Sequence, residues 1–176
     1  MLNRVDLRPV SESDLDIFDA AFQSEAGASE YQWFGFTPTH GLREALGSRG
    51  LLAGPDNMLS VLADGDLVGR VEWLERRWGR RDTSLCWEIA AGILPQARGQ
   101  GIGTSAQHAL VSYLFTHTRV ERIQATTDPE NLAELRCLAK IGFVQEGVVR
   151  RAQWRGGRWH DQVLFSLLRA EFDSRP

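Results

Sequence analysis

The stretch Pro95-Gln96-Ala97-Arg98-Gly99-Gln100-Gly101-Ile102-Gly103-Thr104 decides how this chain of 176 residues folds. The ten residues before it, Leu85–Leu94 (LCWEIAAGIL), are mostly apolar and predict a buried strand. After it, apolar residues recur at helical spacing for four turns, as far as His117. A strand that runs through three glycines into a helix presents unpaired N–H groups at the positive end of the helix dipole. This arrangement predicts an anion site suited to a phosphate or pyrophosphate.

Two widespread phosphate motifs do not fit this stretch. A P-loop requires Gly-Lys-Ser/Thr at the start of the helix, and no lysine is present here. A dinucleotide site requires the spacing GxGxxG, whereas Gln107 stands where the glycine pattern would continue after Gly99, Gly101 and Gly103. The remaining alternative is a glycine-rich turn without a ligand, which is disfavoured because glycines at a helix start cost stability unless something uses them.

The residues on both sides of this turn predict one α/β domain with a mixed sheet over residues 1–176. Asp64-Gly65-Asp66 and Gly156-Gly157 each predict the turn of a hairpin, and Gly142 predicts a left-handed helix cap. Ser11-Glu12-Ser13-Asp14 has the spacing of a capping box at the start of a helix. The expected strands are Val5–Val10, Met58–Ala63, Leu67–Leu74, Leu85–Leu94, Val120–Thr126, Phe143–Trp154 and Trp159–Leu168. Helices are expected after Ser11, from Thr37-Pro38 to Gly47, from Ile102 to His117, and over Asn131–Lys140.

The composition restricts the class of protein. With 43% hydrophobic and 24% charged residues the chain is globular, and no apolar run approaches the roughly 18 residues of a membrane span. The N-terminus lacks a signal-peptide core, so a cytoplasmic location is expected. A net charge of −3 argues against a protein whose main task is to bind nucleic acid. The charge is uneven, because residues 1–66 carry 11 acidic and 4 basic groups while the remainder carries 12 and 16.

Cys86 and Cys137 are the two cysteines of the chain, and neither lies in a CxxC spacing. We expect both to be small buried apolar side chains in a reducing compartment. No metal site is predicted.

The glycine stretch resembles the phosphate-binding motif Q/R-x-x-G-x-G/A of the GCN5-related N-acetyltransferases (GNAT), here Arg98-Gly99-Gln100-Gly101-Ile102-Gly103. Glu88 lies seven residues before Pro95, as in the RimJ/RimL-like branch of that family. The other segments similar to that branch are Val5–Asp16, Asn131 with Lys140 and Ile141-Gly142-Phe143, Glu146-Gly147, and Asp161–Leu168.

The resemblance implies a single GNAT-like domain with a mixed, largely antiparallel, splayed sheet of about seven strands flanked by about four helices. It also implies acetyl-CoA as co-substrate. The residues implied to contact this co-substrate are Ile93, Leu94, Arg98, Gly99, Gly101, Gly103, Thr104 and Asn131. For Asn131 the alternative is that its side chain caps the helix that follows, and both can be true.

The implied reaction is direct attack of an amine on the thioester, which requires a base to remove a proton from the arriving ammonium ion. Glu88 is the candidate catalytic residue, because a carboxylate in an apolar strand beside the acyl site would have a pKa raised by burial. The alternative is a carboxylate that faces the open side of the sheet or pairs with an arginine. The general acid stays open, since Glu134 stands where this branch often has a serine.

An aromatic run, Tyr31–Phe36, falls where the acceptor would enter. Tyr31, Trp33, Phe34 and Trp154 are therefore expected to form an acceptor pocket or lid, the alternative being packing of the core and of the last hairpin. The resemblance implies a protein α-amine as acceptor, and a small amine such as an aminoglycoside, polyamine or amino-acid-like compound is the second candidate. A third reading is a CoA-binding module without catalysis. No nucleic-acid or membrane partner is expected, and the chain would be a monomer or a homodimer.

Overall fold

The computed structural model of the chain describes residues 4–52, 54 and 56–174. Within them one sheet contains β1 (Val5–Pro9), β2 (Asp56–Ala63), β3 (Asp66–Arg77), β4 (Leu85–Ile93), β5 (Arg122–Thr127), β6 (Val144–Arg155) and β7 (Arg158–Leu168). The helices are α1 (Glu12–Phe22), α2 (Glu25–Ala28), α3 (His40–Arg49), α4 (Ile102–His117), α5 (Leu132–Ile141) and α6 (Arg169–Asp173), with a 3₁₀ turn at Pro95–Ala97. None of these helices combines the length and apolarity that a bilayer crossing requires.

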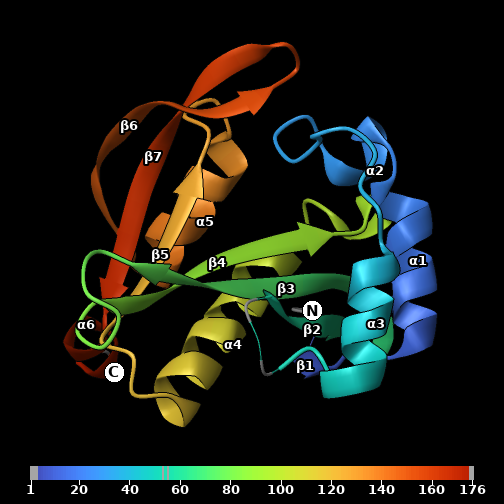
Figure 1. Cartoon of the computed structure of the whole chain (residues 1–176), viewed down its shortest axis with the longest axis horizontal. Coiled ribbons are helices and arrows are strands. Elements are labelled where there is room, and N and C mark those ends of the chain that lie inside the picture. Colours follow the sequence, from blue (N-terminus) through green and yellow to red (C-terminus); the bar gives the residue numbers. More distant parts are fainter. Residues whose placement is uncertain (1–3, 53, 55, 175–176) are drawn as a thin grey trace.

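The strands follow the order β1-β2-β3-β4-β5-β7-β6, and all neighbours are antiparallel except β4 and β5. This parallel pair extends over only two positions, Trp87 opposite Ile123 and Glu88 opposite Gln124. Beyond them β4 continues toward α1 and α2, while β5 turns away toward the β6–β7 hairpin (Figure 1). The expectation of a mixed, splayed, seven-stranded sheet is therefore confirmed.

Two apolar clusters hold the helices on the sheet. The larger one joins α4 and α5 to the sheet and contains Leu110, Leu114 and Leu138, which are fully buried. The smaller one joins α1 to the start of β2 through Leu15, Phe18 and Met58, and α3 packs on its rim. The apolar spacing along α1 and α4 is what allows each helix to bury one stripe against the strands.

The third helix differs from its prediction at both ends. It begins at His40 with Thr39 as N-cap and ends before Gly50, rather than running from Thr37-Pro38 to Gly47. The reason is a tertiary contact, because the Gln23 side chain donates to the carbonyl of Thr37 (2.7 Å) and accepts from its N–H (3.4 Å). The Thr37 carbonyl, which as the predicted N-cap would accept the first helical bond, is thus bonded to Gln23 instead. The short helices α2 and α6 were not predicted, and β3 extends to Arg77, three residues beyond the expected end at Leu74.

A buried carboxylate links three elements at the N-terminal end of the fold. Asp14 is 3% exposed and completes the predicted capping box by accepting from the N–H of Ser11 (2.9 Å). It also pairs with Arg8 of β1 (2.5 Å) and accepts from the hydroxyl of Ser60 in β2 (2.8 Å). The Arg8 guanidinium, helped by Ser11 and Ser60, holds the pKa of Asp14 well below its usual range although burial opposes this. Asp14 therefore contributes to stability in its ionised form.

We predict that Asp14→Asn lowers the free energy of unfolding by about 2 kcal/mol, because it removes the charged acceptor of the hydrogen bonds from Arg8, Ser11 and Ser60. Because the pKa of Asp14 is lowered in the folded state, its contribution is complete above the ordinary value near pH 4 and is lost as the pH falls further. Urea unfolding at pH 7 and pH 3 tests both points, since the difference between wild type and variant should shrink at pH 3. The control is Asp16→Asn on the exposed side of α1, and an equal loss in both variants would contradict the prediction.

Candidate functional site

The divergence of β4 from β5 leaves one edge of β4 without a neighbouring strand. On this edge the carbonyl of Ala91 accepts from the Gln32 side chain (3.2 Å), and the carbonyl of Ile93 accepts from Nε of Arg98 (2.9 Å). A strand residue directs its N–H and its C=O to the same side, so the N–H groups of Ala91 and Ile93 also face the gap. An extended ligand can pair with such an edge in the manner of an added strand.

Leu94 does not belong to this edge. It follows the last residue of β4, is 3% exposed, and donates its N–H to the carbonyl of Val68 in β3 (2.9 Å). The structure therefore places Leu94 in the core, with its backbone donor already used, and Ala91 takes its place beside Ile93 in the gap.

Two of the three glycines in the turn after β4 have backbones that other residues rarely adopt. Gly99 has φ +75° and Gly101 has φ +80°, and a Cβ at either position would enter open space. Gly103 is different, because it lies inside α4 and an added Cβ would make an ordinary contact of 3.6 Å with Ile93. Gly101 is the N-cap of α4, and its carbonyl receives the first helical bond, from Ser105 (3.1 Å). The N–H groups of residues 102–104, including Thr104, therefore have no acceptor within the helix.

Arg98 fastens this turn to α2. Its Nε donates to Ile93, Nη1 donates to the carbonyl of Ala26 (3.2 Å), and Nη2 donates to the carbonyl of Gly27. Burial lowers the pKa of Arg98. Its backbone N–H, expected to face the cofactor, instead donates to the carbonyl of Pro95 (3.3 Å). Arg98 thus positions the turn through its side chain.

Glu88 lies at the last paired position before the strands diverge. One carboxylate oxygen accepts from Nε of Arg76 (3.0 Å) and from the Gln124 amide (2.9 Å), and the other lies 3.5 Å from the Thr126 hydroxyl. The arginine pairing considered as an alternative is therefore present. The side chain is 18% exposed and is fixed at the apex of the gap by residues of β3 and β5.

Asn131 marks the second wall of the gap, where β5 leads into α5. Its side-chain oxygen accepts from the N–H of Glu134 (3.3 Å), and its amide donates to the hydroxyl of Thr127 (3.2 Å). The capping role considered from the sequence is confirmed. Both ends of the amide are occupied, so Asn131 rigidly joins the end of β5 to the start of α5.

Residues 31–32 bridge the two walls at the mouth of the gap. Gln32 bonds to Ala91 on the β4 side, while the hydroxyl of Tyr31 donates to the carbonyl of Glu130 on the β5 side (3.1 Å). The carbonyl of Tyr31 also accepts from Arg155 in β6 (3.2 Å). These contacts place the segment across the opening rather than in the core.

Arg155 is buried and anchors this bridge. It pairs with Asp128 (2.7 Å), whose carboxylate also contacts His160 (3.1 Å), and its guanidinium lies 5.6 Å from the centre of the Tyr31 ring. Burial raises the pKa of Asp128, but the bonds from Arg155 and the N–H of Glu130 outweigh it and leave the pKa below its ordinary value. The sequence places Arg155 among several arginines of the hairpin, and nothing in it indicates that this one is buried.

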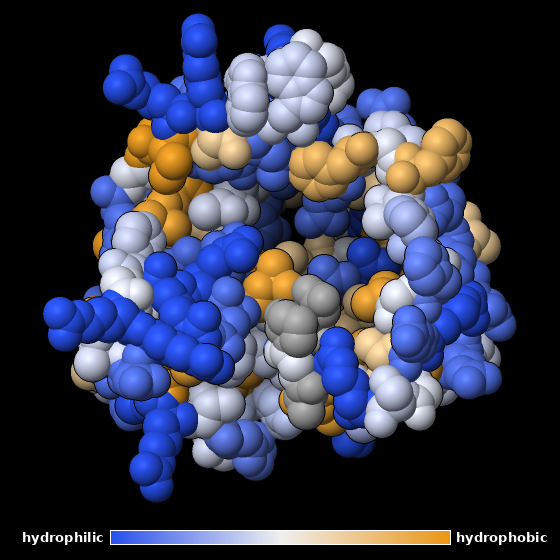
Figure 2. All heavy atoms as spheres, in the orientation of Figure 1, coloured by the Kyte–Doolittle hydropathy of each residue, from blue (hydrophilic) through white to orange (hydrophobic). Residues whose placement is uncertain are grey.

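The other aromatic residues expected at the acceptor side lie on the rim. Phe34 is 56% exposed, and Trp154 is 55% exposed and packs edge-on against Trp159 at the hairpin tip (5.6 Å). Trp33 is half-buried against Phe36 (5.5 Å). The hairpin and the segment after α2 face each other across the opening in Figure 1, and the same face is hollowed between them in Figure 2.

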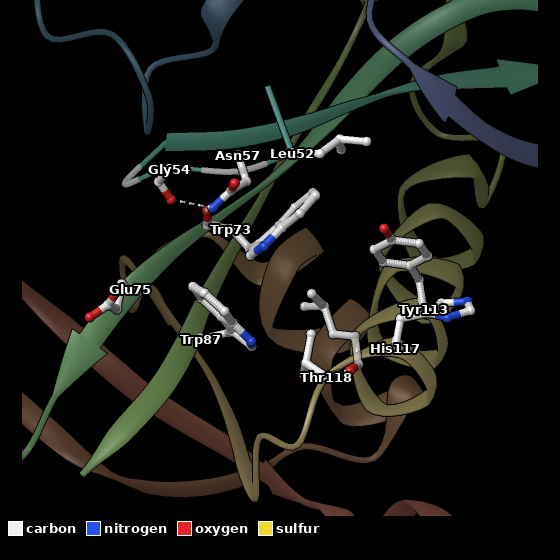
Figure 3. Close-up of a pocket in the computed structure, with 10 residues that line it drawn as sticks. Leu52, Gly54, Asn57, Trp73, Glu75, Trp87, Tyr113, His117 and Thr118 are labelled. Carbon is white, nitrogen blue, oxygen red and sulfur yellow. Dashed lines mark hydrogen bonds between the residues drawn. The ribbon is translucent and has the colours of Figure 1, made fainter. Parts of the chain in front are cut away.

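A separate cavity of about 550 Å³ lies at the opposite end of β4, between β3, β4 and the last turns of α4. Figure 3 shows Trp73, Trp87, Tyr113 and His117 around it. It includes neither the glycine turn nor the apex at Glu88, so it is distinct from the gap.

Comparison with known proteins shows which family the chain belongs to. A family model described as an acetyltransferase (GNAT) domain matches residues 4–144. The uncharacterized N-acetyltransferase YnaD of Bacillus subtilis is 30% identical over 114 residues, 64% of each chain. The probable N-acetyltransferase YjcK of the same organism is 36% identical over 106 residues, 60% of this chain and 57% of YjcK. The aligned part thus spans less than two thirds of these relatives.

Solved structures share the fold over nearly the whole chain. Spermidine N-acetyltransferase from Vibrio cholerae, in complex with CoA and spermine, superimposes with a TM-score of 0.81 at 20% identity, over 97% of this chain and 98% of that one. RimJ of Mycobacterium smegmatis, in complex with CoA-disulfide, gives a TM-score of 0.79 at 24% identity, over 97% and 84%.

We predict that Arg155→Met frees the bridge at residues 31–32 and lowers the free energy of unfolding by about 3 kcal/mol, because it leaves Asp128 buried without its guanidinium partner. Hydrogen exchange followed by mass spectrometry should show faster exchange in a peptide covering residues 29–36. The control is Arg158→Met, since Arg158 is exposed on the same hairpin. Unchanged exchange in 29–36 for Arg155→Met would show that the segment is held by other contacts.

Proposed function

Because the chain belongs to the GNAT acetyltransferase family, we propose that it transfers an acetyl group from acetyl-CoA to a primary amine. The observation that carries this proposal is the gap between β4 and β5. It combines a free strand edge, a glycine turn and a helix N-terminus along one wall with a carboxylate at its apex.

The residues present fit acetyl-CoA. A pyrophosphate fits the open space in front of Gly99 and Gly101. The N–H groups at the start of α4 can donate to its oxygens, and the helix dipole favours its negative charge. The N–H groups of Ala91 and Ile93 suit the amide carbonyls of a pantetheine arm lying along β4. The set that would hold the cofactor is therefore Ala91, Ile93, Gly99, Gly101, Gly103 and Thr104, with Asn131 shaping the opposite wall.

Acetyl-CoA, when bound, supplies an acyl thioester. We assign to Glu88 the acceptance of the proton that the attacking amine must lose, through a water molecule at the apex of the gap. Arg76, Gln124 and Thr126 fix the orientation of its carboxylate, so both oxygens of Glu88 have defined positions. Glu88 and the edge residues Ala91 and Ile93 all belong to β4, so the strand geometry fixes the distance between the carboxylate and the proposed pantetheine site.

The charges at the mouth support a cationic acceptor. Partial burial and the carboxylates of Glu30, Asp128 and Glu130 raise the pKa of Tyr31, so its hydroxyl lies in a field of negative charge. Such a field attracts an ammonium ion, and the exposed aromatic rings of the rim add apolar and cation–π contacts. An amine that arrives protonated fits this entrance, whether it belongs to a protein N-terminus or to a small molecule.

We predict that Gly101→Val weakens binding of CoA by about tenfold or more, because the left-handed backbone becomes strained and the side chain enters the open space of the turn. Gly65→Val is the matched control, because Gly65 also has a left-handed backbone (φ +96°) and open space at its Cβ but lies in the β2–β3 turn. Isothermal titration with CoA measures both. Equal affinity for the two variants would contradict a phosphate site at Gly101.

The test of the proposed activity is release of free thiol from acetyl-CoA with a panel of N-terminal peptides, polyamines, aminoglycosides and amino acids. With the best acceptor, Glu88→Gln should lower kcat by about 100-fold, the size typical of losing a general base, and leave CoA affinity unchanged. Glu72→Gln is the control, because Glu72 on the neighbouring strand β3 is also a carboxylate paired with an arginine, Arg70 of the same strand.

No acetyl transfer to any amine of the panel by a protein that binds CoA would contradict the proposed activity and favour a binding module. A pH–rate profile that is the same for wild type and Glu88→Gln would contradict the role of Glu88 as the base, but not the proposed activity.

A further inference from the structure

An exposed tryptophan in the loop between β3 and β4 donates its indole N–H to a buried residue of β5. Trp78 is 64% exposed, yet its Nε1 donates to the side-chain oxygen of Gln124 (2.9 Å). Gln124 is buried and lies opposite Glu88 in one of the two pairs that join β4 to β5. The contact therefore connects a surface loop to the apex of the gap.

Two further contacts hold Trp78 in this position. Its backbone N–H donates to the carbonyl of Ser84 (3.3 Å), which closes the loop that leads into β4. The guanidinium of Arg122 in β5 lies 5.7 Å from the centre of the indole ring, within the range of a cation–π contact. Arg122 is itself held by two hydrogen bonds to the carboxylate of Glu146 in β6 (2.6 and 2.7 Å). The indole is thus fixed beside β5 although most of its surface faces solvent.

The indole decides which way the amide of Gln124 points. An indole N–H can only donate, so the atom of Gln124 that faces it must be the oxygen. The thiol of Cys86 also donates to this oxygen (3.4 Å). The amide nitrogen is then turned the other way, where it donates to Oε2 of Glu88 (2.9 Å). In the reversed orientation an N–H would face an N–H and an oxygen would face a carboxylate, so both contacts would be repulsive.

This orientation determines how the two oxygens of Glu88 are used. Oε2 accepts from Gln124 and from Nε of Arg76 (3.0 Å). Among the described residues, Oε1 has only a contact with the Thr126 hydroxyl, at the upper limit of hydrogen-bond distance (3.5 Å). Donors that bind a charged oxygen make it a poorer proton acceptor. Oε1 is therefore the oxygen of Glu88 that is left to accept a proton.

We propose that Trp78 is a positioning residue for acetyl transfer, which acts through Gln124 to hold Glu88 with Oε1 as its proton acceptor. The inference rests on the proposed function, in which Glu88 takes the proton of the attacking amine. No bond forms or breaks at Trp78 or at Gln124 during the reaction. The indole sets the direction of one amide, and that direction keeps a donor against the carboxylate instead of a second acceptor.

The first test uses the protein without any ligand. A proton–nitrogen NMR spectrum resolves the indole N–H of each tryptophan and follows its exchange with solvent. The Trp78 signal should exchange about tenfold faster in Gln124→Leu than in wild type, the factor expected from losing one hydrogen bond. Trp154 is the internal control, since it is similarly exposed and its indole N–H has no bond among the described residues. Equal exchange of the Trp78 signal in wild type and variant would overturn the inference.

The second test measures transfer to the best amine of the panel. Trp78→Phe keeps an aromatic ring beside Arg122 but removes the N–H, and its exposed position makes a folding defect small. It should lower kcat by about tenfold, a part of what loss of the base itself would cost. The KM for acetyl-CoA should not change, because the glycine turn and the edge of β4 keep their contacts. The control is Arg81→Gln in the same loop, an exposed residue whose change should leave kcat and KM unaltered.

Double variants separate positioning from a general structural role. If Trp78 acts through Gln124 and Glu88, Trp78→Phe should have no further effect on kcat in proteins that already carry Gln124→Leu or Glu88→Gln. Additive losses in these proteins, or an unchanged kcat in Trp78→Phe alone, would overturn the inference while leaving the proposed function intact. Absence of transfer by the wild type to every amine would instead overturn the proposed function, and with it this role of Trp78.

Discussion

β4 and β5 are hydrogen-bonded only at Trp87 with Ile123 and at Glu88 with Gln124, and every part of the site follows from what happens beyond those two pairs. A strand edge without a neighbour leaves backbone groups that require partners. In this chain two of the carbonyls on the β4 edge are satisfied by side chains, Gln32 and Arg98, instead of by another strand. The gap is kept open because these side chains replace the missing strand on one wall, while β5 pairs with β7 on the other.

The same contacts organise the entrance. Arg98 connects the glycine turn to α2, and Gln32 and Tyr31 continue from there across the mouth to residue 130. Arg155, buried with Asp128, fixes the far end of this bridge. The aromatic run Tyr31–Phe36 is thus held at its first two residues, while Phe36 at its other end is 85% exposed.

Carboxyl groups in three environments show how position determines chemistry. Asp14 is buried with an arginine, and its pKa is lowered, so it acts as an ionic link within the fold. Glu88 is paired at the apex of the gap and is oriented by three side chains. Glu134 is half-buried without an ion pair among the described residues, and burial raises its pKa.

The sequence by itself determined the elements and their ends wherever the determining contacts are local. The capping box at Ser11 and Asp14, the left-handed cap at Gly142, the two hairpin turns and the glycine turn into α4 are short-range features, and all of them are present in the structure. Even the cap at Asn131 was foreseen, because it needs only residues within one helical turn.

Only the tertiary structure decided which side chains meet across long separations. Tyr31 and Arg155 are 124 positions apart, and Gln107 and Glu134 are 27 apart, so neither pair leaves a periodic signal in the sequence. The start of α3 was misplaced for the same reason, since Gln23, far from it in the sequence, bonds to Thr37, the predicted N-cap. Leu94 and the N–H of Arg98 were assigned to the cofactor by the family resemblance. Their backbone donors are used within the fold, and that depends on which strand and which turn lie against them.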